Sequence, residues 1–448
     1  EMGLSEAHLP PAIAAKALLL LSDTDASVRL ATARVLTLKT NLDSAAKLLE
    51  QLRAETEENV RLELLSALGA ACYFALLPGS QIQLSGEIRA ETLDIAARYL
   101  MDEDIRRAAR GADVVGKLLE QNGVGADIAN KYLTMLQQRY VSAMRGNSDS
   151  SLRIELLQVM RRLCEAGAQR ASGAGLFGPI FLESIRDSQA AVRDVALAGL
   201  IAIDRANAMA VVRQYDLASD ESAAVRAQAI RLAGGVGDVR DMDWLAFRLG
   251  ISGEVNLAWQ SMRQIFARSD VRLAAEWVQK LGEAGQAERI GDAEWLAFLA
   301  STEQRAGDIN GGRLAHELRR KLASLHRDRG AFDNAASYYK LLMDSATNEE
   351  KDSFAAAYVE MCLKGTSPDG VTMVAAVVAE RVSGAARPGD AVLAIIEEYL
   401  AANPGSDKTK SVLEALGHIK GNDEWHETLA RWHKQYAEQG KELAAEGG

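Results

Sequence analysis

One short pattern recurs along the chain and constrains its fold more than any other feature. An acidic or polar residue is followed five positions later by an aliphatic residue and then by arginine, as in Asp187 before Val192-Arg193. Copies begin at Asp23, Glu55, Asn147, Asp187 and Asp220, with weaker echoes at Asp102 and Asp270. The aliphatic-arginine pairs lie 32 to 47 residues apart. This period is typical of two-helix repeats that stack on one another.

The residue types explain why such a pattern would stack. An aspartate in the short turn between two helices can cap the second helix with its side chain. The aliphatic residue begins a buried stripe, because Val192, Ala196 and Leu200 recur at helical spacing. The arginine beside that stripe can lay its stem on the next repeat and its guanidinium near an acidic turn residue. We therefore predict structural roles for Arg193 and Arg226.

At these residues the sequence resembles the HEAT-repeat family, over roughly residues 10–285. The best copies are residues 23–36, 187–200 and 220–232. The resemblance implies that the Asp and Arg residues form a structural ladder along the stack. It also implies an all-α fold, an α-α superhelix or solenoid of stacked antiparallel helix pairs. Two Gly/Ser-rich stretches, residues 78–89 and 172–179, are predicted as loops.

After about residue 286 the pattern changes. Ala323, Gly330, Phe332, Ala335 and Tyr339 fall on positions that resemble the tetratricopeptide family, in which small residues let two helices cross closely. A partial second copy runs from residue 389 to 404. We therefore expect two domains, a HEAT-like solenoid at 1–285 and tetratricopeptide-like helical hairpins at 286–448.

Four tryptophans lie near the expected boundary, at intervals of 15 to 18 residues. They are Trp244, Trp259, Trp277 and Trp295. One tryptophan per helix predicts a bulky core, and an exposed aromatic binding strip is the alternative.

Composition narrows the classes of function. The net charge of −11 disfavours binding to nucleic acid and to anionic membranes. No apolar run reaches the length of a membrane span, so we expect a soluble chain, cytoplasmic or periplasmic. The three cysteines are far apart and are expected to be buried free thiols. Because the sequence begins at Glu1 and not at a methionine, a missing N-terminal segment stays open as an alternative.

The sequence lacks the common motifs that carry phosphate or metal chemistry. There is no phosphate-binding loop and no His-Glu-x-x-His motif, since the sequence after His316-Glu317 lacks the second histidine. His426 and His433 lie seven residues apart, which does not match metal-ligand spacing on a helix. We therefore expect no catalytic residue, no metal and no cofactor.

The sequence favours a non-catalytic protein-protein interaction scaffold or adaptor, a subunit of a larger bacterial assembly. The alternatives are a HEAT-type enzyme or nucleic-acid-binding protein, or the scaffold part of a longer chain. The tetratricopeptide resemblance implies a peptide groove near 310–345. Its expected partner-binding residues are Asn334, Tyr338 and Lys340, with the basic residues Arg319, Arg320 and Arg327 attracting an acidic segment. Two readings compete with this site: the arginines are solvated charges paired with nearby carboxylates, and the hairpins pack on a neighbouring subunit.

Overall fold

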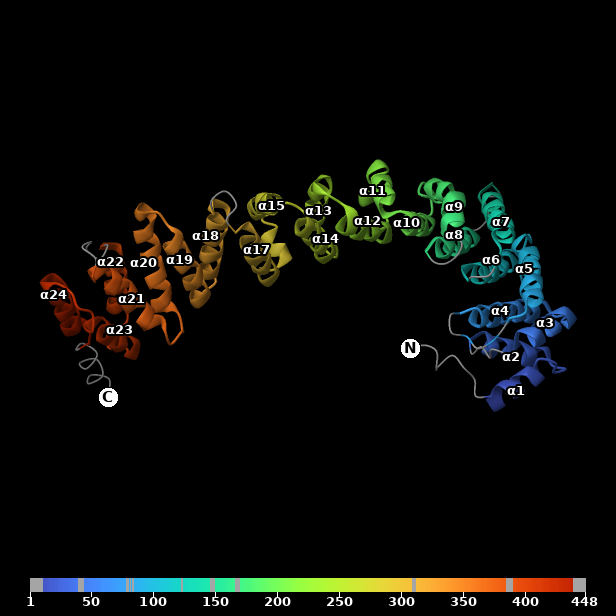
Figure 1. The fold of residues 1–448 in the computed structure, drawn as a ribbon, viewed down its shortest axis with the longest axis horizontal. Coiled ribbons are helices and arrows are strands. Elements are labelled where there is room, and N and C mark those ends of the chain that lie inside the picture. Colours follow the sequence, from blue (N-terminus) through green and yellow to red (C-terminus); the bar gives the residue numbers. More distant parts are fainter. Residues whose placement is uncertain are drawn as a thin grey trace. The chain divides into compact units, whose positions relative to one another are not determined.

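The computed structural model describes residues 11–38, 44–77, 80, 82, 84–121, 124–145, 150–165, 170–307, 312–383 and 390–437. Every regular element within these ranges is helical, and no strand occurs in them (Figure 1). The predicted all-α fold of stacked antiparallel helix pairs is therefore confirmed.

The chain divides into two compact units. Unit 1 contains residues 1–245 and 260–265, and unit 2 contains residues 246–259 and 266–448. Helices α13 (Met242–Arg248) and α14 (Val255–Arg268) contribute residues to both units. A change of repeat family at residue 285 stays a prediction.

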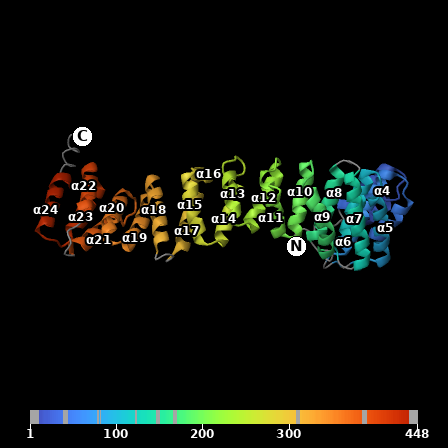
Figure 2. The same ribbon diagram turned by 90° about the horizontal axis from the view of Figure 1, so that it is seen from above.

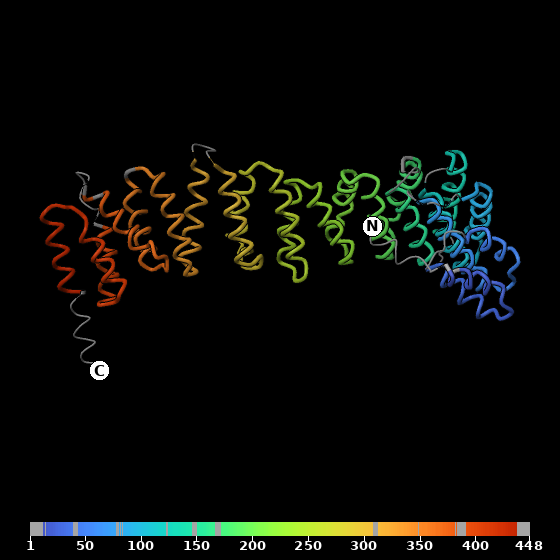
Figure 3. Tube along the Cα trace, turned by 60° about the horizontal axis from the view of Figure 1, so that its bottom comes forward, coloured from blue at the N-terminus to red at the C-terminus, as the bar shows by residue number. Residues whose placement is uncertain are grey.

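The described residues of unit 1 form six consecutive helix pairs, followed by parts of α13 and α14. The paired helices are α1 (Pro11–Leu20), α2 (Ala26–Leu38), α3 (Ala45–Ala54), α4 (Glu58–Ala75), α5 (Gly86–Leu100), α6 (Ile105–Glu120), α7 (Ala126–Arg145), α8 (Ser150–Glu165), α9 (Arg170–Ser184), α10 (Ala190–Ile203), α11 (Arg205–Gln214) and α12 (Ala223–Val236). The second helices α2, α4, α6, α8, α10 and α12 pack in series as one row, and α3, α5, α7 and α9 form another. The chain runs up and down through successive pairs in the tube of Figure 3.

Helices α5 and α6 cross at very close range, and Gly111 makes this possible. A Cβ atom at Gly111 would lie 2.2 Å from the amide nitrogen of Leu100 and 2.5 Å from the carbonyl oxygen of Ala96. Both atoms belong to the backbone of α5, so no side-chain rotation can relieve such a contact. A larger residue at this position would have to push the two helices apart.

The ladder that the HEAT resemblance implies is present in unit 1, and Arg193 shows its full geometry. One Nη atom of Arg193 donates to the carbonyl oxygens of Asp187 and Ser188, at 2.9 and 3.2 Å, in the turn of its own repeat. The Nε and second Nη atoms donate to the two carboxylate oxygens of Asp220 in the next repeat, each at 2.8 Å. One side chain therefore ties two turns together with charge-assisted hydrogen bonds.

Other arginines repeat this arrangement. Arg29 donates to two carbonyl oxygens of its own turn and, through Nε and Nη2, to the carboxylate of Glu55 at 2.7 and 2.9 Å. Arg153 forms an ion pair with Asp187. Arg226 donates to the carbonyl oxygens of its own turn at 2.8 and 2.9 Å. The structural role predicted for Arg193 and Arg226 agrees with these contacts.

Asp270 caps α15 as predicted, by accepting from the amide of Arg272 at 2.8 Å, whereas Asp187 and Asp220 work differently from the prediction. The Asp187 carboxylate accepts from the amide of Gln189 at 2.8 Å, and the Asp220 carboxylate accepts from the amide of Ser222 at 2.8 Å. Gln189 and Ser222 precede the first residues of α10 and α12, so these carboxylates close the turn and do not cap the helix itself. The polar residue Asn147, which begins another copy, lies outside the described residues.

The loop predicted at residues 172–179 is wrong, because these residues lie inside α9 (Arg170–Ser184). Phe177 and Phe181 are fully buried on that helix, and this burial outweighs the low helix propensity of glycine and of Pro179. The other predicted loop, residues 78–89, is wrong at its end, because α5 begins at Gly86 and residues 86–89 lie in that helix. Residues 78, 79, 81 and 83 of that loop are outside the described residues.

Unit 2 continues with helix pairs. Its helices are α15 (Val271–Glu283), α16 (Ala287–Ile290), α17 (Asp292–Ala306), α18 (Arg313–Asp328), α19 (Phe332–Ser345), α20 (Asn348–Lys364), α21 (Gly370–Ser383), α22 (Asp390–Ala402), α23 (Asp407–Gly417) and α24 (Asp423–Trp432). Helix α15 packs on α17, α18 on α19, and α20 on both α21 and α22. Figure 2 shows these helices following one another along the unit.

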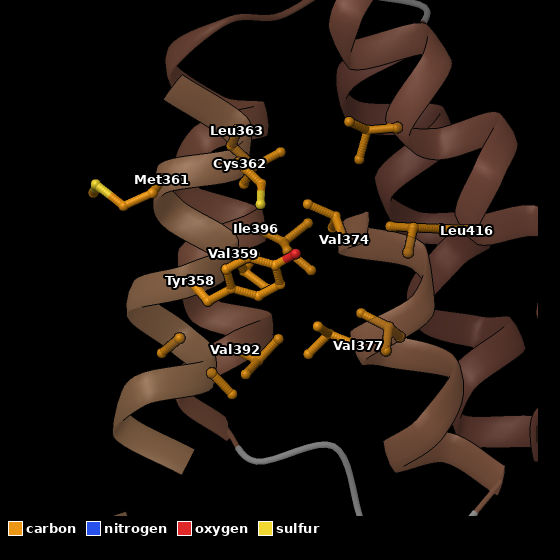
Figure 4. Close-up of a cluster of buried hydrophobic side chains, with 14 of the residues drawn as sticks. Tyr358, Val359, Met361, Cys362, Leu363, Val374, Val377, Val392, Ile396 and Leu416 are labelled. Atoms are coloured by element: carbon orange, nitrogen blue, oxygen red, sulfur yellow. The ribbon is translucent and has the colours of Figure 1, made fainter. Parts of the chain in front are cut away.

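The core of unit 2 contains the small and aromatic residues singled out in the sequence. Ala323, Ala335 and Tyr339 are buried in one cluster with residues of α20 to α24. In Figure 4, Tyr358, Val374 and Ile396 point toward one another from α20, α21 and α22. The partial second copy begins at residue 389, which lies outside the described residues.

The tryptophans belong mainly to the core, as predicted. Trp259, Trp277 and Trp295 are buried, and Trp244 is half-buried. In unit 2 the rings of Trp259 and Trp295 lie 6.2 Å apart, and Phe298 packs edge-on against Trp259 at 5.0 Å. These contacts favour the core reading over an exposed binding strip for the three buried tryptophans.

Candidate functional site

The predicted basic residues on α18 are each engaged by a carboxylate. Arg319 donates to Glu303 of α17 at 2.6 Å. Arg320 pairs with Glu350, and its guanidinium lies 5.0 Å from the centre of the Phe354 ring. These two arginines therefore present a partly neutralised surface and not a cluster of unpaired charge.

Arg327 is also paired, and with its own neighbour in sequence. Its Nε atom donates to Asp328 at 3.1 Å, and both side chains are exposed. An exposed pair of this kind contributes little to stability. The three pairs together agree with the reading of these arginines as charges paired to nearby carboxylates.

The predicted residues of α19 fall on two faces of the helix. Asn334 is exposed, and Tyr338, four residues on, shares its face. Tyr338 is half-buried and stacks on the ring of His326 at 5.7 Å, with 13° between the planes. Lys340 lies six residues from Asn334, on another face, and donates to Asp344 at 2.7 Å. Burial raises the pKa of Tyr338, and the nearby Glu303 carboxylate adds to this rise.

A groove in the described part of unit 2 lies between α15 and α18. It encloses about 670 Å³. Its lining residues are Ala275, Val278, Gln279, Gly282, Glu283, Leu314, Glu317, Leu318, Arg320 and Lys321. Val278 and Leu318 are buried at its floor, while Gln279, Glu317 and Lys321 are exposed.

This groove joins the first helices of two successive pairs, because α15 pairs with α17 and α18 pairs with α19. Of the six predicted partner-binding residues, Arg320 is the one that lines it. The α15 side was missed by sequence reasoning. The available signal was the recurrence of Ala275, Gln279 and Gly282 at helical spacing, a face of small and polar residues that no buried stripe explains.

A second groove of unit 2, of about 420 Å³, lies between α20 and α22. Phe332, Leu363, Ile395 and Tyr399 supply its apolar part. Both lysines that line this groove already have partners within the chain. Lys364 pairs with Glu360 at 2.7 Å. Lys408 donates to the carbonyl oxygens of Cys362 and Gly365, at 3.2 and 2.6 Å, so its charge holds the end of α20.

Within the described residues, no group of three or more His, Cys, Asp and Glu side chains is placed to hold a metal ion. No helix in the same ranges combines the length and apolar character needed to cross a bilayer. The cysteine thiols are all buried. Burial raises the pKa of Cys72 to about 11, which disfavours the reactive thiolate at neutral pH.

No protein-family model and no curated protein matches this chain. Solved structures similar to it include a crystal structure of importin beta obtained in ammonium sulfate, with 13% identity, a TM-score of 0.43, and coverage of 96% of this chain and 57% of that chain. A homology model of the full-length AP-3 complex gives 10% identity, a TM-score of 0.42, and coverage of 96% and 91%. The fission yeast (S. pombe) condensin Cnd3-Cnd2 subcomplex gives 13% identity, a TM-score of 0.30, and coverage of 90% of this chain and 61% of that chain.

The chain thus spans about three fifths of the importin beta and condensin chains that it resembles. At these identities and TM-scores the likenesses carry no argument about function, which therefore has to come from the surface of the chain itself.

Proposed function

We propose that this chain is a non-catalytic scaffold for protein-protein interaction, a subunit or adaptor within a larger assembly. The observation that carries the proposal is the groove between α15 and α18. Its floor is apolar and its rim is charged, the combination typical of grooves that bind peptide segments.

The rim favours a partner segment of mixed charge. Glu283 of α15 and Glu317, Arg320 and Lys321 of α18 all line the groove, so charges of both signs are present along it. A segment that placed an acidic and a basic side chain in the matching order would gain attraction from charges of both signs, while a segment of one sign would meet repulsion. Leu314 and Leu318 supply apolar contact for a side chain that points inward.

The residues of α19 are proposed as a secondary surface. Asn334 is exposed beside the half-buried Tyr338, and Lys340 is exposed on the neighbouring face. Arg319, Arg320 and Arg327 keep their proposed role in attracting an acidic segment, although the attraction would have to compete with their present carboxylate partners. The tetratricopeptide-like character of residues 286–448 is likewise kept as a proposal.

The test is affinity capture from the native source with the full chain, followed by mass spectrometry. The groove variant is Glu317→Lys with Lys321→Glu, which exchanges the two charges and leaves the net charge unchanged. The matched control is Glu276→Lys with Lys280→Glu, which exchanges an exposed charge pair of α15 outside the lining of the groove. We expect the partner to be lost by the groove variant and retained by the control. Equal capture by the wild type and the groove variant would remove this groove from the proposal.

Site-specific photo-crosslinking then locates the contact. A crosslinking residue at Gln279 lies on the rim of the groove, whereas one at Lys280, the next residue of α15, lies outside its lining. Labelling of the captured partner from position 279 and not from position 280 supports the proposal. Labelling from neither position, with the partner still bound, would place the interaction elsewhere on the chain.

A further inference from the structure

A groove in unit 1 lies where the ladder is interrupted. It encloses about 400 Å³ between α3, α4, α5 and α6. The residues that line it are Leu52, Arg53, Glu58, Arg61, Glu91, Ile95, Arg98, Tyr99, Asp102 and Arg107. All of them belong to unit 1.

The regular ladder predicts what Arg61 should do. In other repeats the arginine reaches the acid of the following repeat, as Arg29 reaches Glu55 and Arg193 reaches Asp220. Arg61 is the arginine of the copy that begins at Glu55, and the next acid of the pattern is Asp102. The regular geometry would therefore join Arg61 to Asp102.

Arg61 and Asp102 do not form this pair in the structure, and we call this position the open rung of the ladder. The Asp102 carboxylate instead accepts a hydrogen bond from the Nη1 atom of Arg107, in its own repeat, at 3.3 Å. Arg107 also pairs with Glu58 at 2.7 Å. Arg61 consequently forms no ion pair with any carboxylate in the described part of the chain, and its buried Nε atom has no hydrogen-bond acceptor.

The neighbour of Arg61 in the groove is an aromatic hydroxyl, not an acid. Burial raises the pKa of Tyr99, and the adjacent Arg61 guanidinium opposes this rise. Arg98 also lines the groove, is exposed, and makes no ion pair within the residues that the structure describes. Two guanidinium groups therefore face one groove without a carboxylate of their own.

The charges that line the groove favour one additional anion. Four arginines line it against three acids, Glu58, Glu91 and Asp102. The acids are already bound, Glu91 by Arg53 and the other two by Arg107. An incoming carboxylate can accept two parallel hydrogen bonds from the planar fork of an arginine, as the acids of the complete rungs do.

We infer that this groove binds a carboxylate side chain from an acidic segment of a partner protein, which completes the open rung at Arg61. The inference rests on the proposed scaffold function, since a partner supplies the carboxylate. A peptide fits better than a nucleic acid, because the three acids of the lining would repel a continuous phosphate backbone. Ile95 and Tyr99 offer apolar and aromatic contact to the residue beside the carboxylate.

Fluorescence anisotropy with the full chain tests this directly. The probe is a labelled peptide with one central glutamate between glycine-serine flanks, and its match carries a glutamine in that place. We expect the glutamate peptide to bind about tenfold or more tightly than the glutamine peptide. The double variant Arg61→Gln with Arg98→Gln should abolish this preference. The control Arg34→Gln removes an exposed arginine of α2 outside the groove and should retain it.

Two further measurements distinguish bidentate binding from simple charge attraction, and a preference for carboxylate from binding of any anion. Arg61→Lys keeps the charge and loses the fork, so an affinity equal to that of the wild type would overturn the bidentate geometry. Displacement of the glutamate peptide by inorganic phosphate at the same concentration of anionic groups would overturn the preference for carboxylate. Thermal unfolding of each variant, followed by circular dichroism, shows whether a lost preference reflects a lost fold.

The outcome is independent of the test of the α15–α18 groove. Failure of the glutamate peptide to bind the wild type would overturn this inference alone, and the captured partner would still test the scaffold. Conversely, the Glu317→Lys with Lys321→Glu variant should bind the glutamate peptide as the wild type does, because those residues belong to unit 2. A loss of binding in that variant would place the carboxylate site outside unit 1.

Discussion

Replacing Gly111 by alanine tests the close crossing of α5 and α6. In an open helical position this change stabilises a protein by about 1 kcal/mol, because alanine has the higher helix propensity. At Gly111 the new methyl group would lie 2.2 Å from the Leu100 nitrogen, whereas ordinary contact begins at 3.4 Å. The backbone of α5 must then move away by about 1 Å. Overpacking of this kind lowers the free energy of unfolding by about 3 kcal/mol. The expected net loss is about 2 kcal/mol.

Gly175 provides the matched control in the same unit. It lies in the middle of α9, is exposed, and has no neighbouring atom within 4 Å of the position of an added Cβ. Gly175→Ala should therefore raise the stability of its helix by about 1 kcal/mol. The same substitution is thus expected to act in opposite directions at two positions.

Hydrogen exchange read by mass spectrometry suits a repeat protein, because it reports the stability of each segment and does not assume a single unfolding step. Peptides from α5 and α6 should lose about 30-fold of their protection in Gly111→Ala. Peptides from α9 should gain about fivefold in Gly175→Ala. Unchanged or increased protection of α5 and α6 in Gly111→Ala would refute the reasoning from close approach.

Three other predictions concern the ladder and the thiols. Arg193→Ala removes the partner of the buried Asp220 carboxylate and should cost about 2–3 kcal/mol, measured by urea unfolding; a cost below about 0.5 kcal/mol would show that the rung is not structural. Hydrogen bonds from Arg29 lower the pKa of Glu55 from 4.5 to about 2, so the stability that this pair contributes is present above about pH 4.5 and is lost as the pH falls through about 2. Glu55→Gln should therefore flatten the dependence of unfolding free energy on pH in that window, and an equal slope in both proteins would contradict the assignment. The three cysteines, including Cys72, should react with a thiol reagent only after denaturation, and rapid labelling of the native chain would show that a thiol is accessible.

The sequence predicted the repeating fold because the information is local. The acid, the aliphatic residue and the arginine of each copy lie within seven positions, and the contacts of Arg193 follow directly from that spacing. Helix α9 was missed for the opposite reason. Its glycines and Pro179 argue against a helix locally, and only the burial of Phe177 and Phe181 against other helices decides in its favour.

The candidate sites were harder to predict than the fold. The pattern gives Arg61 and Asp102 the same roles as their counterparts, and only the side-chain geometry shows that Arg107 binds Asp102 first. The α15–α18 groove joins residues some forty positions apart, such as Val278 and Leu318, that no sequence motif connects. Pairings between side chains of separate repeats are therefore the part that sequence reasoning could not reach.

The ladder also determines how a gene for such a chain can change in length. Asp187 and Asp220 close equivalent turns, and 33 residues separate them. Deleting residues 187–219 would bring Asp220 into the place in the sequence that Asp187 holds after Arg153, so the arginine would still find an aspartate. Duplicating the same segment would add an arginine and an acid together. Insertions and deletions of this whole repeat thus keep each arginine of the segment opposite an acid, whereas those of part of the repeat leave one charge without its partner. Selection should therefore accept the first far more often than the second.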